Sequence, residues 1–391
     1  MQTLNGKLME PTAFAVGGHR GMGANILRQN AVHPPWRENT TGSFLAAAAT
    51  GASFVEFDVQ VTADGVPVLW HDDTVDFGDP SAPSRAPVAD LTLAEFKALG
   101  SITSAAGAAA TRLAVVRSFW EELELDAAAA AAAAAGGVST PPPSPPRAAA
   151  PPRSPPRSPV PRGRSPHRHW RCARDEGFPT LKEVFSALPP GVGFDIEVKM
   201  ATPDTLAVTP PEEVERVIAP ILAAVERCCP PPAAGGAAAP HERPVVFSSF
   251  DPDVCRELRA RQSRWPVLFL STGGVDAHAD ARRTSLAAAL EVAVGYGLCG
   301  LILDSGALQA NPGFVSAVAA AGRELRVYTY GQQNDDPEWV LQQAALGVHG
   351  VICDDVPAAL AALAAPPAPA AEALAAPSML PPLPPATRVA A

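Results

Sequence analysis

The feature of this chain that most constrains its fold is a repeated alternation of short apolar runs with helix-like segments. The runs are rich in Val, Ile and Phe, as β-strands are, and helix-start pairs such as Thr40-Thr41 and Asp336-Pro337 open many of the segments between them. Eight such repeats predict an α/β fold of the TIM (β/α)8 barrel type. The expected strands cover residues 13–18, 54–59, 193–199, 244–249, 266–271, 300–304, 324–330 and 350–354.

One further apolar run, residues 66–70, does not fit this alternation. The extended run that begins at residue 54 continues to residue 61, so only Thr62-Ala63-Asp64-Gly65 precede residue 66, whereas a parallel crossover needs a dozen residues or more. The run must therefore pair antiparallel with the second strand. This hairpin delivers His71 to the rim of the barrel.

Low-complexity stretches interrupt the predicted barrel and follow it in this chain of 391 residues. The chain contains 44 prolines, and an alanine run at 127–135 leads into a Pro/Ser/Arg-rich stretch that buries too little apolar surface to fold. Residues 91–99, before this stretch, are expected to be helical. We predict a lead at 1–12, a barrel domain at 13–363 interrupted by a disordered insertion at about 127–170, and a disordered Pro/Ala tail at 364–391.

Charge and composition argue against several classes of protein. The net charge is −10 and the basic run is confined to the Pro-rich insertion, which disfavours a nucleic-acid partner. The six cysteines form no C-x-x-C pair, so a zinc site or a disulfide framework has little support. No leader pattern opens the chain, and no apolar run reaches the ~18 residues that cross a bilayer. We expect a cytoplasmic protein without stable membrane insertion, and no particular protein partner is indicated.

Acidic side chains gather at the ends of two expected strands. Residues two apart in a strand share a face, so Glu56 and Asp58 point together, as do Asp195, Glu197 and Lys199. Carboxylates on a buried face are costly unless something neutralises them, and Mg²⁺ and Ca²⁺ both prefer oxygen ligands. The strand ends therefore predict a divalent cation, Mg²⁺ or Ca²⁺, at the carboxyl end of the barrel.

The first strand ends in GGHRGMG, residues 17–23, which places His19 and Arg20 at the same rim. With His71, the mouth then holds two histidines, a cation site and two basic side chains, a combination that indicates phosphodiester cleavage. Arg20 and Lys199 would stabilise charge on the phosphoryl oxygens. One histidine would deprotonate the nucleophile and the other would protonate the leaving alkoxide.

Several stretches carry a resemblance to a known family: GGHRGMGAN, VEFDVQVTADGVPVLWHDD, GFDIEVK, VVFSSFDPD and VYTYGQQNDDPE. They resemble the glycerophosphodiester phosphodiesterase family, in particular its eukaryotic branch with glycerophosphocholine phosphodiesterases. The resemblance implies a metal-dependent hydrolase that converts glycerophosphodiesters, such as glycerophosphocholine, to sn-glycerol 3-phosphate and an alcohol on a TIM barrel. It implies acid/base roles for His19 and His71, phosphate binding by Arg20 and Lys199, and metal binding by Glu56, Asp58 and Glu197.

Two alternative functions stay open. A lysophospholipase D or phospholipase C-type phosphodiesterase would use the same chemistry on lipids, although no apolar segment is apparent near the rim. A catalytically silent phosphodiester-binding regulatory protein would lack one of the functional residues, and none is missing. Asp72 either orients a histidine or belongs to a turn, and Asn39 or Thr40 is expected to cap the helix that follows.

Overall fold

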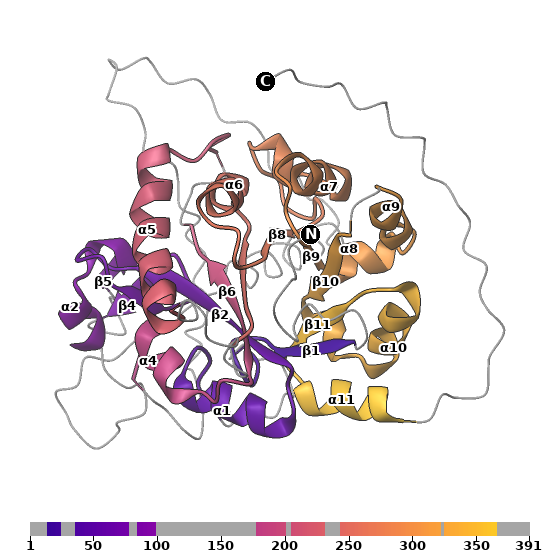
Figure 1. The fold of residues 1–391 in the computed structure, drawn as a ribbon, viewed down its shortest axis with the longest axis horizontal. Coiled ribbons are helices and arrows are strands. Elements are labelled where there is room, and N and C mark those ends of the chain that lie inside the picture. Colours follow the sequence, from indigo (N-terminus) through magenta and orange to yellow (C-terminus); the bar gives the residue numbers. More distant parts are fainter. Residues whose placement is uncertain are drawn as a thin grey trace, which may run out of the picture.

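Eight parallel strands form a closed barrel in the computed structural model (Figure 1). The structure describes residues 14–24, 36–77, 84–98, 177–200, 205–230, 243–321 and 324–365. The barrel strands are β1 (Ala15–Gly18), β2 (Phe54–Val61), β6 (Gly193–Val198), β7 (Val245–Ser249), β8 (Val267–Ser271), β9 (Gly300–Asp304), β10 (Arg326–Tyr330) and β11 (Gly350–Cys353). Because β1 pairs with both β2 and β11, the ring is complete, and the predicted TIM barrel is confirmed.

Helices surround the barrel and connect successive strands (Figure 1). Thr40 accepts a hydrogen bond from the backbone N–H of Ser43 and so caps the first helix, while Thr180 and Glu183 form a capping box. The helices that match the helix-like segments of the sequence are α1 (Thr41–Thr50), α4 (Leu181–Ala187), α5 (Pro211–Cys228), α6 (Pro252–Arg261), α7 (Leu286–Gly295), α9 (Phe314–Ala320), α10 (Pro337–Leu346) and α11 (Val356–Ala364). A further short helix, α8 (Ser305–Ala310), follows β9 directly.

The predicted hairpin is present after the second barrel strand. β3 (Pro67–Leu69) pairs antiparallel with β2, and the turn between them contains Gly65 in the left-handed region with φ +77°. A second, unforeseen hairpin follows, formed by β4 (Thr74–Phe77) and β5 (Ser84–Pro87). The 3₁₀ helix η2 (Val88–Asp90) and α2 (Leu93–Ala98) then complete this side of the molecule, with α2 inside the predicted helical range.

The end of α2, near residue 98, lies beside the segment that begins at residue 177. Phe96 in α2 and Phe178 lie with ring centroids 4.9 Å apart, and Trp70 lies 5.0 Å from Phe178. Lys97 Nζ also lies 2.7 Å from Glu183 Oε2 of α4. The predicted insertion at about 127–170, the lead at 1–12 and residues 366–391 of the predicted tail lie outside the described residues.

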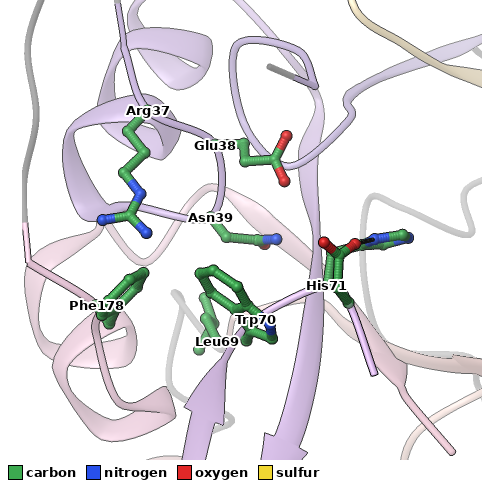
Figure 2. A pocket seen from close by; sticks show the side chains of 8 residues that line it. Arg37, Glu38, Asn39, Leu69, Trp70, His71 and Phe178 are labelled. Atoms are coloured by element: carbon green, nitrogen blue, oxygen red, sulfur yellow. Dashed lines mark hydrogen bonds and ion pairs between the residues drawn. The ribbon is translucent and has the colours of Figure 1, made fainter. Parts of the chain in front are cut away.

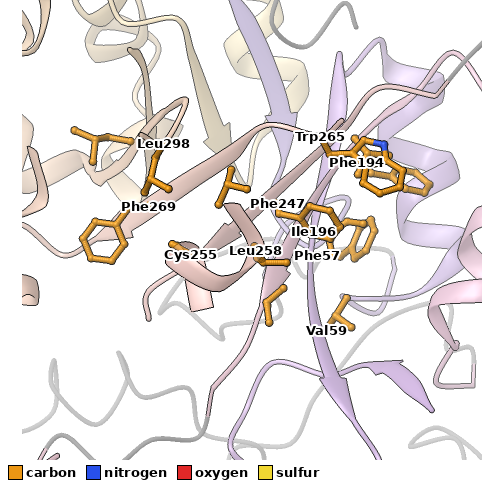
Figure 3. Close-up of a cluster of buried hydrophobic side chains, with 14 of the residues drawn as sticks. Phe57, Val59, Phe194, Ile196, Phe247, Cys255, Leu258, Trp265, Phe269 and Leu298 are labelled. Atoms are coloured by element: carbon orange, nitrogen blue, oxygen red, sulfur yellow. The ribbon is translucent and has the colours of Figure 1, made fainter. Parts of the chain in front are cut away.

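Alternate residues of the barrel strands face two different environments. The outward face of β2 contributes Phe57 to the large apolar core between strands and helices, where its ring lies 5.1 Å from that of Phe194 (Figure 3). The inward face carries Phe54, Glu56 and Asp58 in turn. Phe54 belongs to a separate apolar cluster with Leu268 and residues of other strands. Along β2, the polar residues Glu56 and Asp58 therefore follow the apolar cluster that fills the inside of the barrel.

Candidate active site and metal centre

Three buried carboxylates meet at the carboxyl end of neighbouring strands. The parallel register of β2 and β6 sets Glu56 beside Asp195 and Asp58 beside Glu197. One oxygen from each of Glu56, Asp58 and Glu197 lies within 4.8 Å of the other two, and all three side chains are buried. The structure thus brings together the three residues predicted to bind metal, in an arrangement that can hold a metal ion.

Two buried basic side chains border this carboxylate cluster. Arg20 Nη1 donates to Glu38 Oε1 at 2.9 Å, and Arg20 Nε lies 3.3 Å from Asp58 Oδ2. Lys199 Nζ lies 3.0 Å from Glu197 Oε1 and 3.5 Å from Asp58 Oδ1. Burial alone would lower the pKa of Arg20 and of Lys199, but the surrounding carboxylates raise both pKa values above their ordinary range. Both side chains are therefore cationic throughout the physiological pH range.

The acidic groups nevertheless outnumber these cations. Burial, followed by the charge of Asp58 and other carboxylates, raises the pKa of Glu56 well above its usual value. Burial also raises the pKa of Glu197, although Lys199 opposes it. For Asp195, burial raises the pKa to about 7 even though Ser248 Oγ donates to its Oδ1 at 2.7 Å. A divalent cation would remove this excess of negative charge, and the oxygen ligands fit Mg²⁺ or Ca²⁺.

Asp58 is the exception among the carboxylates. Burial would raise its pKa, but His71, Lys199 and Arg20 together lower it below the usual range. Asn39 Nδ2 also donates to Asp58 Oδ2 at 2.9 Å, and the Asp58 N–H donates to Asn39 Oδ1 at 3.3 Å. Among the described residues, Arg20 and Asn39 are the non-glycine residues with positive φ, at 49° and 54°. Both lie against Asp58, which is consistent with backbone strain at a functional site.

Each of the two histidines is paired with an aspartate through Nδ1. His71 Nδ1 lies 2.6 Å from Asp72 Oδ1, and both residues are buried. Burial, assisted by Arg20 and Lys199, lowers the pKa of His71, and burial raises the pKa of Asp72. Of the two roles that the sequence left open for Asp72, this contact favours the one in which Asp72 orients His71.

His19 Nδ1 lies 2.7 Å from Asp354 Oδ1, at the end of β11. The sequence reasoning missed Asp354, although it stands at the carboxyl end of an expected strand, where functional residues of barrels gather.

A small pocket opens beside His71 (Figure 2). Phe178, Trp70 and Leu69 form one wall, and the loop that contains Glu38 and Asn39 forms another. The guanidinium of Arg37 covers the ring of Phe178 at 3.7 Å from its centroid. This packing fixes the loop before α1, and with it the Glu38 carboxylate that holds Arg20. The aromatic residues around the second hairpin therefore support the catalytic end of the barrel.

Comparison with known proteins agrees with this geometry. Residues 19–358 match the glycerophosphoryl diester phosphodiesterase family, and the match covers the barrel from the end of β1 onward, with its polar mouth. The chain belongs to this family. As a glycerophosphodiester phosphodiesterase, it is a phosphoric diester hydrolase.

Curated relatives in plants and fungi share about a third of the residues. The chain is 29% identical to the chloroplastic glycerophosphodiester phosphodiesterase GDPD1 of Arabidopsis thaliana over 349 residues, which are 88% of this chain and 78% of that protein. It is 32% identical to the glycerophosphocholine phosphodiesterase gde1 of Schizosaccharomyces pombe over 348 residues, 88% of this chain and 28% of that protein. The phosphodiesterase therefore spans about a quarter of the length of this fungal relative.

Solved structures share the barrel fold. The crystal structure of a glycerophosphoryl diester phosphodiesterase from Silicibacter pomeroyi matches with a TM-score of 0.55 at 20% identity, covering 92% of this chain and 95% of that one. A phosphodiesterase from Oleispira antarctica, in complex with the product sn-glycerol-3-phosphate, matches with a TM-score of 0.51 at 17% identity, covering 90% and 97%. In the part of the chain that the structure describes, no helix has the length and hydropathy of a membrane span.

Proposed function

We propose that this phosphodiesterase hydrolyses glycerophosphodiesters, such as glycerophosphocholine, to sn-glycerol 3-phosphate and an alcohol, with Mg²⁺ or Ca²⁺ as cofactor. The observation that carries the proposal is the cluster of Glu56, Asp58 and Glu197, whose oxygens lie within 4.8 Å of one another beside two buried cations. Ionised carboxylates in such a cluster are costly unless further positive charge compensates them, and a bound divalent cation would supply it. The product bound to the Oleispira antarctica structure is consistent with this reaction.

The basic residues would stabilise charge on the phosphate, and the two histidines would transfer protons. When bound, the divalent cation would stabilise negative charge on the phosphoryl oxygens. Arg20 and Lys199 would contact the same oxygens, because both are held at the cluster by ion pairs. Of His19 and His71, one would accept the proton of the attacking water or substrate hydroxyl. The other would donate a proton to the alkoxide oxygen as the P–O bond breaks.

Release of glycerol 3-phosphate tests this proposal. We expect activity with Mg²⁺ or Ca²⁺, loss of activity in EDTA, and a loss of at least about 100-fold in His19→Ala and in His71→Ala, since general acid or base catalysis contributes about 10²- to 10⁴-fold. His349→Ala serves as a matched control, because His349 bonds the backbone of β10 instead of the site. Full activity of the wild type in EDTA, or of His19→Ala, would refute the mechanism. Tight binding of diesters without turnover would instead support a silent binding protein.

A lysophospholipid is a second candidate substrate, and three exposed apolar side chains on loops at the carboxyl end of the barrel favour it. Leu206, Val208 and Val275 are 41%, 61% and 63% exposed on loops that follow β6 and β8. Both loops meet at Asp253, which accepts hydrogen bonds from the Thr209 N–H and from Arg282. An acyl chain that contacts these side chains would bury apolar area that is now exposed.

A substrate panel distinguishes the two candidates. Glycerophosphocholine, glycerophosphoethanolamine, glycerophosphoinositol and lysophosphatidylcholine would be compared at fixed Mg²⁺ and Ca²⁺. If lysophospholipids are substrates, replacing Leu206, Val208 and Val275 with serine should raise KM for lysophosphatidylcholine and leave turnover of glycerophosphocholine unchanged. Equal effects on both substrates would exclude a role of these residues in acyl binding.

A further inference from the structure

Asp354 joins the first and last strands of the barrel at the point where His19 enters the site. Asp354 follows β11 directly, and its Oδ1 lies 2.7 Å from His19 Nδ1. The same oxygen accepts the backbone N–H of Ala24 at 2.9 Å. The backbone N–H of His19 donates to the carbonyl of Cys353 at 3.0 Å. Two consecutive residues at the end of β11 therefore hold both the backbone and the ring of His19.

The position of Asp354 is itself fixed from two sides. Gly23 has φ +100°, and a side chain at this position would come within 2.9 Å of the Asp354 carbonyl oxygen, so only glycine allows the loop after β1 to approach this closely. On the other side, Asp335 Oδ1 accepts the backbone N–H groups of Asp354 and Asp355 at 2.8 and 3.0 Å. The carboxylate of Asp354 thus has a defined place beside the histidine ring.

This contact determines which ring nitrogen of His19 carries hydrogen. An ionised carboxylate only accepts hydrogen bonds, so His19 Nδ1 must be the donor to Asp354 Oδ1. In a neutral imidazole the other nitrogen, Nε2, then holds a lone pair. Because Nε2 lies on the side of the ring away from Nδ1, the nitrogen that exchanges a proton with substrate is the one that Asp354 does not contact.

We propose that Asp354 is a positioning residue for His19, which holds Nδ1 as the hydrogen-bond donor and leaves Nε2 as the proton acceptor of the reaction. The proposal rests on the proposed acid/base role of His19. The two aspartate–histidine pairs also differ in environment. The side chains of His19 and Asp354 are each 22% exposed, whereas those of His71 and Asp72 are 8% and 9% exposed. His19 is therefore the more solvent-accessible of the two histidines.

Kinetics of three variants test the role of Asp354. Asp354→Ala should lower kcat about 10- to 100-fold, as loss of an orienting partner typically does, with KM changed less than about twofold because Asp354 does not bind substrate. Asp354→Asn should recover part of this loss, since the amide oxygen can still accept both hydrogen bonds. Asp355→Ala is the matched control, because Asp355 is the neighbouring aspartate, is exposed, and caps α11 by accepting the Ala358 N–H at 3.0 Å instead of bonding His19. It should stay near wild-type kcat.

Nitrogen NMR of protein labelled with ¹⁵N-histidine provides a readout that does not depend on activity. With His19 assigned by comparison with His19→Ala, its Nε2 in the resting wild type should show the shift of a lone-pair nitrogen. In Asp354→Ala, hydrogen should be found on either nitrogen. Hydrogen on Nε2 in the wild type overturns the proposal even if Asp354→Ala fails to fold. Unchanged kcat in Asp354→Ala also overturns it, whereas an active His19→Ala refutes the proposed function instead.

Discussion

Replacing Glu56 with glutamine should remove the response of the protein to divalent cations while leaving the cation-free fold intact. The carboxylate oxygens of the cluster lie within 4.8 Å of one another, and two unit negative charges at that distance repel each other by about 3.5 kcal/mol at an effective dielectric constant of about 20. Burial and this repulsion raise the pKa of Glu56 well above its ordinary value, so the cation-free protein favours the protonated form of Glu56 far more than it would for an exposed glutamate. Glutamine resembles that protonated form, and its amide oxygen can still accept the Arg20 N–H that Glu56 Oε2 accepts at 2.9 Å.

The free energy of unfolding, measured by urea titration in EDTA and in excess Mg²⁺ or Ca²⁺, decides this prediction. At a cation concentration about 100 times Kd the wild type should gain about 2.7 kcal/mol, and Glu56→Gln should gain almost none. Glu38→Gln is the control, because Glu38 pairs with Arg20 but is outside the carboxylate cluster, so its cation response should persist. Cation binding should also strengthen as pH rises, since Glu56 must lose its proton to bind. An equal gain in Glu56→Gln and the wild type would refute the reasoning.

Three further substitutions give independent tests. The pKa of Asp195 is about 7 in the folded protein, against an ordinary value of 3.8. Its contribution to stability is therefore complete below about pH 4 and is lost as pH rises through 7. Measured by urea titration in EDTA, the free energy of unfolding of Asp195→Asn should rise relative to that of the wild type by about 1.4 kcal/mol per pH unit over this window. Phe57→Ala should lower the free energy of unfolding by about 3–5 kcal/mol, because the buried ring packs 5.3 and 5.1 Å from those of Phe44 and Phe194; a loss below 1 kcal/mol would contradict this packing. Arg20→Lys should lower kcat/KM about 10- to 100-fold, because a single ammonium cannot reproduce the forked contacts to the two carboxylates, and unchanged kinetics would exclude a role for that fork.

Much of the fold could be predicted from local patterns of residues. The apolar runs marked the barrel strands, and the short turn at Asp64-Gly65 was enough to place His71 on an antiparallel hairpin. The hairpin of β4 and β5 escaped prediction because both strands have only four residues, and although TVDF alternates polar and apolar side chains, SRAP does not.

The acidic cluster could be predicted from the sequence because it follows from the same regular pattern as the strands. Residues two apart share a face, which linked Glu56 to Asp58, and the barrel topology supplied the neighbouring Glu197. The partner of His19 was not accessible in this way. Asp354 lies 335 positions further along the chain, and its contact depends on the pairing of β1 with β11 and on the exact path of the loop after β1. Such contacts follow from tertiary geometry, which no short pattern encodes.

The stability of the barrel should depend only weakly on the length of residues 99–176. The two sides of this stretch are already held together by the aromatic contact between Phe96 and Phe178 and by the ion pair of Lys97 with Glu183. Since the two anchor points are already adjacent, a chain of any length joins them, and closing about 78 residues instead of about 8 costs only about 2 kcal/mol of loop entropy. This side of the barrel is therefore a natural acceptor site for inserted sequence. A linker of about eight residues in place of 99–176 should raise the free energy of unfolding by up to about 2 kcal/mol and preserve the catalytic constants.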